Sequence, residues 1–202
     1  MVSDDLRQFD LNFPGFWIEG ADRNWACKTL QVLTLIQNLF VEAVTAYSLF
    51  CPITADNFLE FIDSDKSPYE RCLNGLYGKA FVFALDGIGK LLSRLCEHLD
   101  PPPAVGPLRE KYETEFGHLK HIRDSAIHLE DRGRGVTRFQ KPIDTRVFLL
   151  GSFVERRFLF TGEDGRQYEV EVSKSTLNDA KEIVQGIIAA YSWSPCVLVD
   201  GA

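Results

Sequence analysis

The chain lacks the paired cysteines that mark metal sites and disulfide frameworks. Its 202 residues contain five cysteines, an odd number, without a CxxC pair: Cys27, Cys51, Cys72, Cys96 and Cys196. This pattern predicts neither a zinc–thiolate site nor a set of disulfides. We interpret the cysteines as buried, reduced thiols of a cytosolic protein, and we expect no metal and no other cofactor.

The chain also lacks a leader-like N-terminus and an uninterrupted apolar run. Residues 1–20 carry acidic side chains and have neither a basic n-region nor an apolar h-region. The most apolar stretch, residues 26–51, is interrupted by five polar side chains: Lys28, Gln31, Gln37, Asn38 and Glu42. Such a stretch is too polar to cross a bilayer, so we expect a soluble, cytoplasmic protein that does not enter a membrane.

An excess of basic residues is missing as well. The net charge of -7 and the pI of about 5.1 argue against a general nucleic-acid coat protein, although they leave room for a nuclease with a local basic cleft. The sequence shows no glycine-rich phosphate loop, serine nucleophile elbow or dinucleotide fingerprint. A hydrophobic fraction of 45% in 202 residues suits one compact domain with a substantial core.

Apolar residues recur at steps of three and four along most of the chain, which predicts amphipathic helices. The predicted helices span residues 24–50, 54–62, 67–99, 108–130 and 176–191. Ser67 and Pro68 form a start signal for the third of these helices, and Thr176 with Asp179 resembles a capping box for the last. Glycines along residues 67–99 favour close helix–helix packing.

The pattern changes to short apolar and alternating segments at residues 146–151, 154–161 and 167–173, which predicts three antiparallel strands. The run Glu163-Asp164-Gly165 is a hairpin turn signal. The predicted fold is therefore mainly α, a bundle of four to five helices with a small three-stranded antiparallel insert before the last helix. We assign residues 1–202 to a single domain, with an irregular arm (1–23), a helical bundle (24–132), a β-meander (146–173) and a closing helix (175–192).

Three of the four histidines lie within eleven residues around Arg123. Arginine offers a rigid fork of donors for a phosphate, and histidine exchanges its proton most readily near neutral pH. Asp124 lies four residues before His128, so its carboxylate is placed to orient the imidazole. Arg123, Asp124 and His128 are therefore the candidate catalytic residues for cleavage of RNA, in which a ribose 2′-hydroxyl attacks the neighbouring phosphate.

Arg123 and His128 do not share a face of an ideal helix, because five residues correspond to a rise of about 7.5 Å and a turn of about 140°. They converge only if the helix ends between them, or if a second protomer completes the site. Two other interpretations stay open. The pair is also typical of a helix-end cation and a surface histidine. Alternatively, two neighbours among His121, Asp124 and His128, which share a helix face, are placed to bind a metal ion.

The segment after this motif is locally basic and contains one aromatic residue, Phe139. Such a patch is typical of a surface that grips a nucleic-acid backbone, although arginines paired with nearby acids in a solvated loop explain it equally well. The candidate RNA-binding residues are His121, Arg132, Arg134, Arg138 and Lys141.

Residues 121–132, HIRDSAIHLEDR, resemble the signature of the HEPN domains (higher eukaryotes and prokaryotes nucleotide-binding), in which an arginine and a polar residue precede a histidine at the end of a long helix. The resemblance implies a helical bundle that dimerises so that two motifs face each other across a cleft. It implies metal-independent cleavage of RNA by Arg123 and His128, with Asp124 as the polar residue. It also implies RNA, a second copy and an antitoxin or regulatory protein as partners. A non-catalytic helical module that binds a protein or nucleotide is the alternative.

Overall fold

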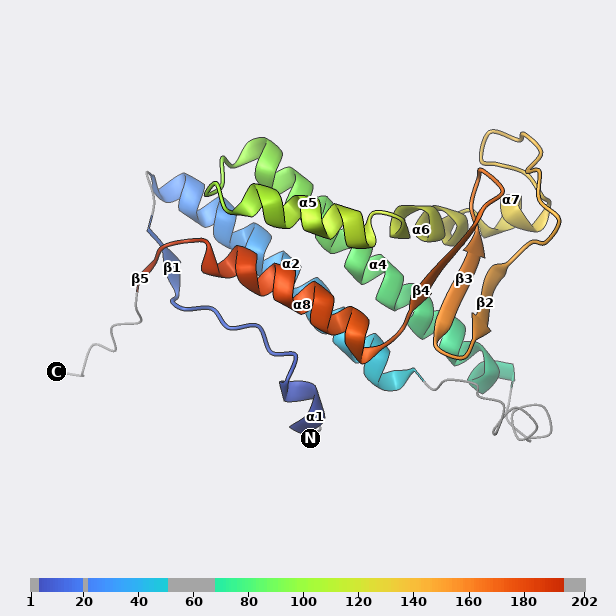
Figure 1. The fold of residues 1–202 in the computed structure, drawn as a ribbon, viewed down its shortest axis with the longest axis horizontal. Coiled ribbons are helices and arrows are strands. Elements are labelled where there is room, and N and C mark those ends of the chain that lie inside the picture. The colour runs from blue at the N-terminus through green and yellow to red at the C-terminus, as the bar shows by residue number, and fades with distance from the viewer. Residues whose placement is uncertain (1–3, 20–21, 51–67, 195–202) are drawn as a thin grey trace.

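The computed structural model describes residues 4–19, 22–50 and 68–194. Two long helices, α2 (Arg23–Leu49) and α4 (Pro68–His98), pack side by side and form the centre of the bundle (Figure 1). Helix α5 (Val105–Phe116) packs against α4, and the closing helix α8 (Lys174–Ala189) contacts α5 and α2. The predicted helix at residues 54–62 and the start signal at Ser67 lie outside the described residues.

The apolar stripes of the long helices form the core, as the helical periodicity predicts. Leu33, Ile36 and Phe40 of α2 are buried, and Trp25 packs against the same core. The apolar stripe of α4 has five fully buried residues, each at 0% exposure: Phe81, Leu85, Ile88, Leu92 and Leu95. Helix α8 buries Leu177, Ala180, Val184 and Ile187, and Tyr191, which follows the helix, is buried as well. Burial of this apolar surface is the main term that stabilises the bundle.

Three antiparallel strands precede α8, which confirms a mainly helical fold with a three-stranded insert before the last helix. The strands β2 (Leu150–Val154), β3 (Arg157–Thr161) and β4 (Gln167–Glu171) lie in the order β2-β3-β4. The turn predicted at residues 163–165 joins β3 to β4, and Gly165 takes the left-handed φ of 77° that favours glycine there.

The boundary between the first two strands was predicted wrongly. The structure ends β2 at Val154 and turns at Glu155, which has a φ of 55°. A glutamate in the left-handed region is uncommon, and no glycine or asparagine marks this turn in the sequence. The predicted strand over 154–161 therefore contains a turn and only its second part belongs to β3.

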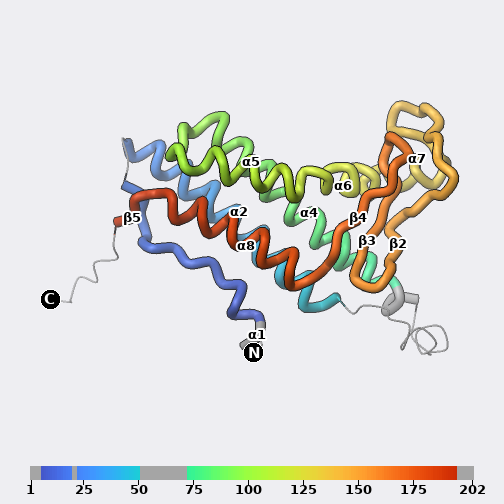
Figure 2. Tube along the Cα trace, in the orientation of Figure 1, coloured from blue at the N-terminus to red at the C-terminus, as the bar shows by residue number. Residues whose placement is uncertain are grey.

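The N-terminal arm is more regular than the sequence indicates. It contains a short helix, α1 (Asp4–Arg7), and the strand β1 (Trp17–Ile18), which pairs antiparallel with β5 (Trp193–Ser194). Figure 2 shows the arm running along α8, with the β1–β5 pair at one end of the molecule and the three-stranded sheet at the other. The side-chain amide of Gln185 exchanges two hydrogen bonds of 2.8 Å with the backbone of Asn12.

The helix predicted over residues 108–130 is interrupted twice. Helix α5 ends at Phe116, α6 (Leu119–Ile127) begins after a break at residues 117–118, and α7 (Leu129–Gly133) follows a second break. His128 has φ -101° and ψ 44° and therefore leaves the helical path. The continuous apolar stripe across these residues predicts the buried face correctly but hides both breaks.

The predicted capping box of α8 is wrong. Ser173, the residue that follows β4 after Val172, is the N-cap, and its Oγ accepts a hydrogen bond from the backbone N–H of Thr176 at 3.2 Å. Serine at this position satisfies an N–H group that has no partner within the helix. Helix α8 consequently starts at Lys174, two residues before the predicted start.

Helix α2 is long and apolar enough to span a membrane by length and composition, and among the described helices it alone meets this criterion. A core helix of a soluble protein meets the same criterion, and α2 buries seven residues inside the bundle.

The interpretation of the cysteines as buried is wrong for Cys27 and Cys96, which are partly exposed, and for Cys72, which is exposed. Cys51 and Cys196 lie outside the described residues.

Candidate functional site

Arg123 of α6 lines a cleft of about 300 Å³ between α4, α5 and the start of α6. Its basic lining residues are Lys90, Arg94, Lys120 and Arg123, and its acidic ones are Asp86 and Glu113. Four cations against two carboxylates leave the cleft with a formal charge of +2, whereas the whole chain carries -7. A cleft of this charge favours an anionic ligand, because opposite charges attract more strongly where solvent is partly excluded.

Two carboxylates hold the guanidinium of Arg123. Its Nη1 donates to Oδ2 of Asp86 at 2.6 Å, and its Nε donates to Oδ1 of Asp124 at 2.9 Å. The Asp86 side chain is only 8% exposed, and burial raises the pKa of this carboxyl above its ordinary value, with Arg123 offsetting part of the effect. Lys90 contacts the same Asp86 oxygen at 2.9 Å. Arg123 is thus fixed in the cleft wall between α4 and α6.

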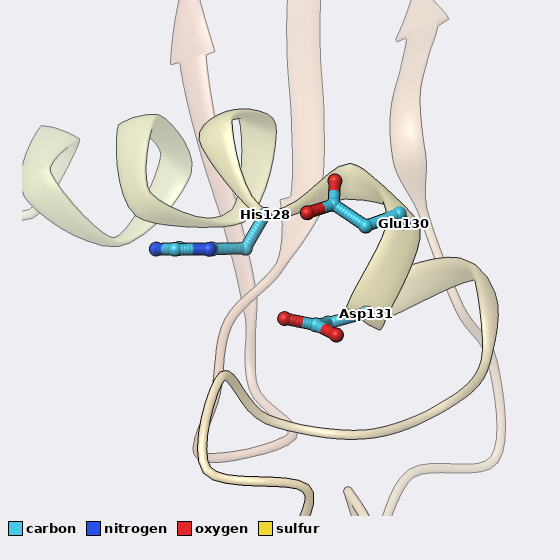
Figure 3. A group of neighbouring side chains, drawn as sticks. All are labelled: His128, Glu130 and Asp131. Carbon is cyan, nitrogen blue, oxygen red and sulfur yellow. The ribbon is translucent and has the colours of Figure 1, made fainter.

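His128 lies in different surroundings, at the junction of α6 and α7. Figure 3 shows its imidazole with the carboxylates of Glu130 and Asp131, and one ligand atom from each of the three residues lies within 4.8 Å of the other two. Asp131 accepts hydrogen bonds from Arg134 at 2.6 Å and from Gln140 at 3.1 Å, which lower the pKa of its carboxyl. This cluster was missed in the sequence, although three ligating residue types within four positions are a readable signal.

The structure does not bring the three candidate catalytic residues together in one chain. Among the described residues, no hydrogen bond or ion pair joins Arg123 to His128. The predicted support of His128 by the Asp124 carboxylate is also not formed, because Asp124 accepts from Arg123 instead. Only the backbone of His128 contacts Asp124, through its N–H and the Asp124 carbonyl at 3.1 Å. The backbone thus keeps the i, i+4 hydrogen bond, and the predicted contact is missing because the Asp124 side chain bonds the neighbouring guanidinium.

Arg132 is a structural residue, which corrects its assignment to the RNA-binding set. It is 1% exposed, and its guanidinium donates to Glu163 and to the carbonyl of Val136, each at 2.9 Å. Burial raises the pKa of Glu163, but hydrogen bonds from Arg132 and from the backbone of Arg138 outweigh this effect and leave the pKa below its ordinary value. The ion pair ties α7 to the turn between β3 and β4.

The other predicted RNA-binding residues lie at or near the surface. The His121 ring stacks on Tyr168, with centroids 4.4 Å apart and planes inclined by 15°. Arg138 lies over the ring of Phe139 at 4.7 Å, and that ring is 66% exposed. Lys141 is exposed, and Arg134 is exposed but ion-paired with Asp131. The alternative of a solvated loop whose arginines pair with acids describes Arg134; Arg132 is also paired with an acid but is buried in α7.

The sequence also suggested a metal ion bound by two neighbours among His121, Asp124 and His128, and the contacts of these residues do not support that pairing. His121 is stacked on Tyr168 and Asp124 binds Arg123, whereas His128 is grouped with two carboxylates that follow it.

Asp86, the buried carboxylate that lines the cleft, was also missed in the sequence. The signal that could have indicated it is its i, i+4 spacing from Lys90 on α4.

Comparison with known proteins finds no matching family model, no similar curated protein and no similar solved structure.

Proposed function

We propose that the protein is a HEPN-like endoribonuclease of the cytoplasm that cleaves RNA without a metal. Arg123 carries the proposal, because its guanidinium lines a basic cleft on an acidic protein and is held there by Asp86. An arginine fixed in this way is suited to bind a phosphate and to stabilise negative charge that develops on it. Asp124 orients the guanidinium through its own hydrogen bond.

The proposed reaction uses the ribose of the substrate as nucleophile. The 2′-oxygen attacks the adjacent phosphorus while a general base accepts the 2′-hydroxyl proton, and the bond from phosphorus to the 5′-oxygen breaks. The leaving 5′-oxygen receives a proton, so the products are a 2′,3′-cyclic phosphate and a 5′-hydroxyl. His128 transfers protons in this scheme, because its imidazole exchanges protons near neutral pH.

The site is proposed to be composite, formed by two copies of the chain. Within one chain, Arg123 lines the cleft and His128 lies beside two carboxylates, so the proposal uses a second copy to place an imidazole near each guanidinium. Two exposed apolar side chains flank the Arg123–Asp86 pair at one helical turn. Phe83, three residues before Asp86, is 38% exposed, and Ile127, four residues after Arg123, is 53% exposed. A homodimer that buries both would bring the two motifs to one interface.

The test is incubation of purified protein with mixed RNAs and with matched DNA in the presence of EDTA. We expect RNA cleavage with 5′-hydroxyl ends and intact DNA. Arg123→Ala and His128→Ala should each lower the rate by roughly 100-fold or more, as loss of one transition-state contact commonly does. Arg157→Ala and His98→Ala are matched controls, because both side chains are exposed and lie outside the cleft. Intact RNA at every substrate tested would refute the nuclease.

A non-catalytic binding module is the second candidate, and one observation favours it. Asp86 and Asp124 already satisfy the Arg123 guanidinium, so the isolated chain offers a neutralised arginine rather than a free cation. Such a module would recognise an antitoxin, a regulatory protein or a nucleotide. It predicts uncut RNA together with a stable complex with that partner, and Arg123→Ala would then leave the RNA unaffected.

A further inference from the structure

The junction between α6 and α7 places three metal-ligating side chains on one turn. His128 is the C-cap of α6, and Glu130 and Asp131 follow in the first turn of α7. Their ligand atoms lie within 4.8 Å of one another, and Figure 3 shows both carboxylates on the side of the junction that the imidazole occupies. On a continuous helix His128 and Asp131 would already share a face, whereas Glu130, two residues after His128, would point to another; with the helix broken at His128, all three are grouped.

We propose that His128, Glu130 and Asp131 bind a divalent transition-metal ion of the Zn²⁺ type. One imidazole nitrogen and two carboxylates form a mixed nitrogen–oxygen set that suits Zn²⁺ and its neighbours. Ca²⁺ and Mg²⁺ are disfavoured, because they prefer sites built only of oxygen ligands. Three protein ligands leave at least one coordination position for water.

The surroundings of Asp131 support this assignment. Its side chain is 12% exposed, and Oδ1 is held by Arg134 and Gln140. Such outer contacts orient a ligating carboxylate and leave its second oxygen for the ion. The charges of Glu130, Asp131 and Arg134 sum to -1, which still attracts a dication. Glu130 is exposed, so its side chain is free to rotate from the observed spacing to the shorter distances of a metal complex.

A metal bound here would also affect RNA cleavage by His128, and this consequence rests on the proposed nuclease function. An imidazole nitrogen that ligates an ion cannot exchange a proton, so Zn²⁺ would inhibit cleavage instead of supporting it. The site would then act as a metal-dependent brake on His128. Metal binding itself is independent of any activity and is measured without RNA.

The experiment is calorimetric titration of chelator-treated, reduced protein with Zn²⁺, followed by Co²⁺ as a spectroscopic substitute. We expect one site whose Co²⁺ spectrum lacks thiolate charge-transfer bands, which separates it from binding by cysteines. His128→Ala and Glu130→Gln should each weaken this site by at least 10-fold. The matched control is the double variant Glu97→Gln/His98→Ala, which removes an exposed histidine–carboxylate pair 3.8 Å apart on α4 and should leave binding unchanged.

Unchanged Zn²⁺ affinity in both His128→Ala and Glu130→Gln would overturn the metal site, as would a Co²⁺ spectrum dominated by thiolate bands. Failure of the nuclease is distinguished from failure of the metal site. Uncut RNA with His128-dependent Zn²⁺ binding removes the nuclease and keeps the site. RNA cleavage that is insensitive to Zn²⁺, with no His128-dependent binding, removes the site and keeps the nuclease.

Discussion

The guanidinium of Arg123 donates to the carboxylate of Asp86 across 2.6 Å, and this ion pair joins α6 to α4. Both side chains are largely buried, at 16% and 8% exposure, so neither charge is well solvated without the other. Breaking such a pair is costly even where forming it contributes little net stability, because a buried charge is left without a partner.

Replacement of Asp86 by alanine should therefore lower the free energy of unfolding by about 2 to 4 kcal/mol. The matched control is Lys90→Ala, which removes the second cation on the same carboxylate. Lys90 is 56% exposed, and its loss should cost under about 1 kcal/mol, as for other surface ion pairs. Urea unfolding followed by circular dichroism measures both. Equal losses of unfolding free energy in Asp86→Ala and Lys90→Ala would show that the burial of Arg123 does not determine how destabilising the loss of Asp86 is.

The pair between Arg132 and Glu163 predicts a dependence of stability on pH. The folded pKa of Glu163 lies below its unfolded value near 4.5, so the pair stabilises the fold above that pH and the contribution is lost as the pH falls through the folded pKa. Glu163→Ala should cost about 2 to 3 kcal/mol at pH 7, because Arg132 keeps its charge inside the protein.

The check is thermal unfolding of the wild type and of Glu163→Ala between pH 7 and pH 3. The difference in stability between the two proteins should become smaller toward pH 3. Glu169→Ala serves as control, because Glu169 is 51% exposed and pairs with Arg157 at 3.6 Å. A gap of constant size across the whole range would contradict the assigned role of the ionised Glu163.

Two glycines of α4 should respond in opposite directions to replacement by alanine. A Cβ at Gly78 would lie 2.8 Å from the Phe153 ring, whereas a Cβ at Gly75 meets nothing within 4 Å. Gly75→Ala should raise stability by about 0.5 to 1 kcal/mol through helix propensity. Gly78→Ala should lower it by about 1 to 3 kcal/mol through overpacking. Denaturant midpoints distinguish them, and stabilisation by Gly78→Ala would show that β2 adjusts freely.

The proposed dimer predicts that a charge at either flanking apolar residue prevents association. Sedimentation of the wild type should give twice the chain mass of 22.9 kDa. Phe83→Glu and Ile127→Glu should each give the monomer mass with an unchanged circular dichroism spectrum. Val154→Glu is the control, since Val154 is 48% exposed but lies on β2. A monomeric wild type at assay concentration would remove the composite site.

The candidate site was predictable only in part. The concentration of histidines around Arg123 identified the segment, and the structure places that arginine in a cleft. The roles of neighbouring charges were not predictable. Arg132 and Arg138 look alike in the sequence, yet one is buried on Glu163 and the other covers an exposed ring, because each outcome depends on contacts with a distant strand turn or a local loop.

The long helices, the three-stranded insert and the buried stripes follow from the amino-acid sequence alone, because periods of 3.6 and 2 residues are local properties of the chain. Three other relationships came from the tertiary fold: the arm pairs with a strand about 175 residues away, Asp86 holds Arg123, and His128 is grouped with Glu130 and Asp131. These relationships depend on which elements meet in space and on where a helix breaks to let them meet. Local periodicity carries no information on either.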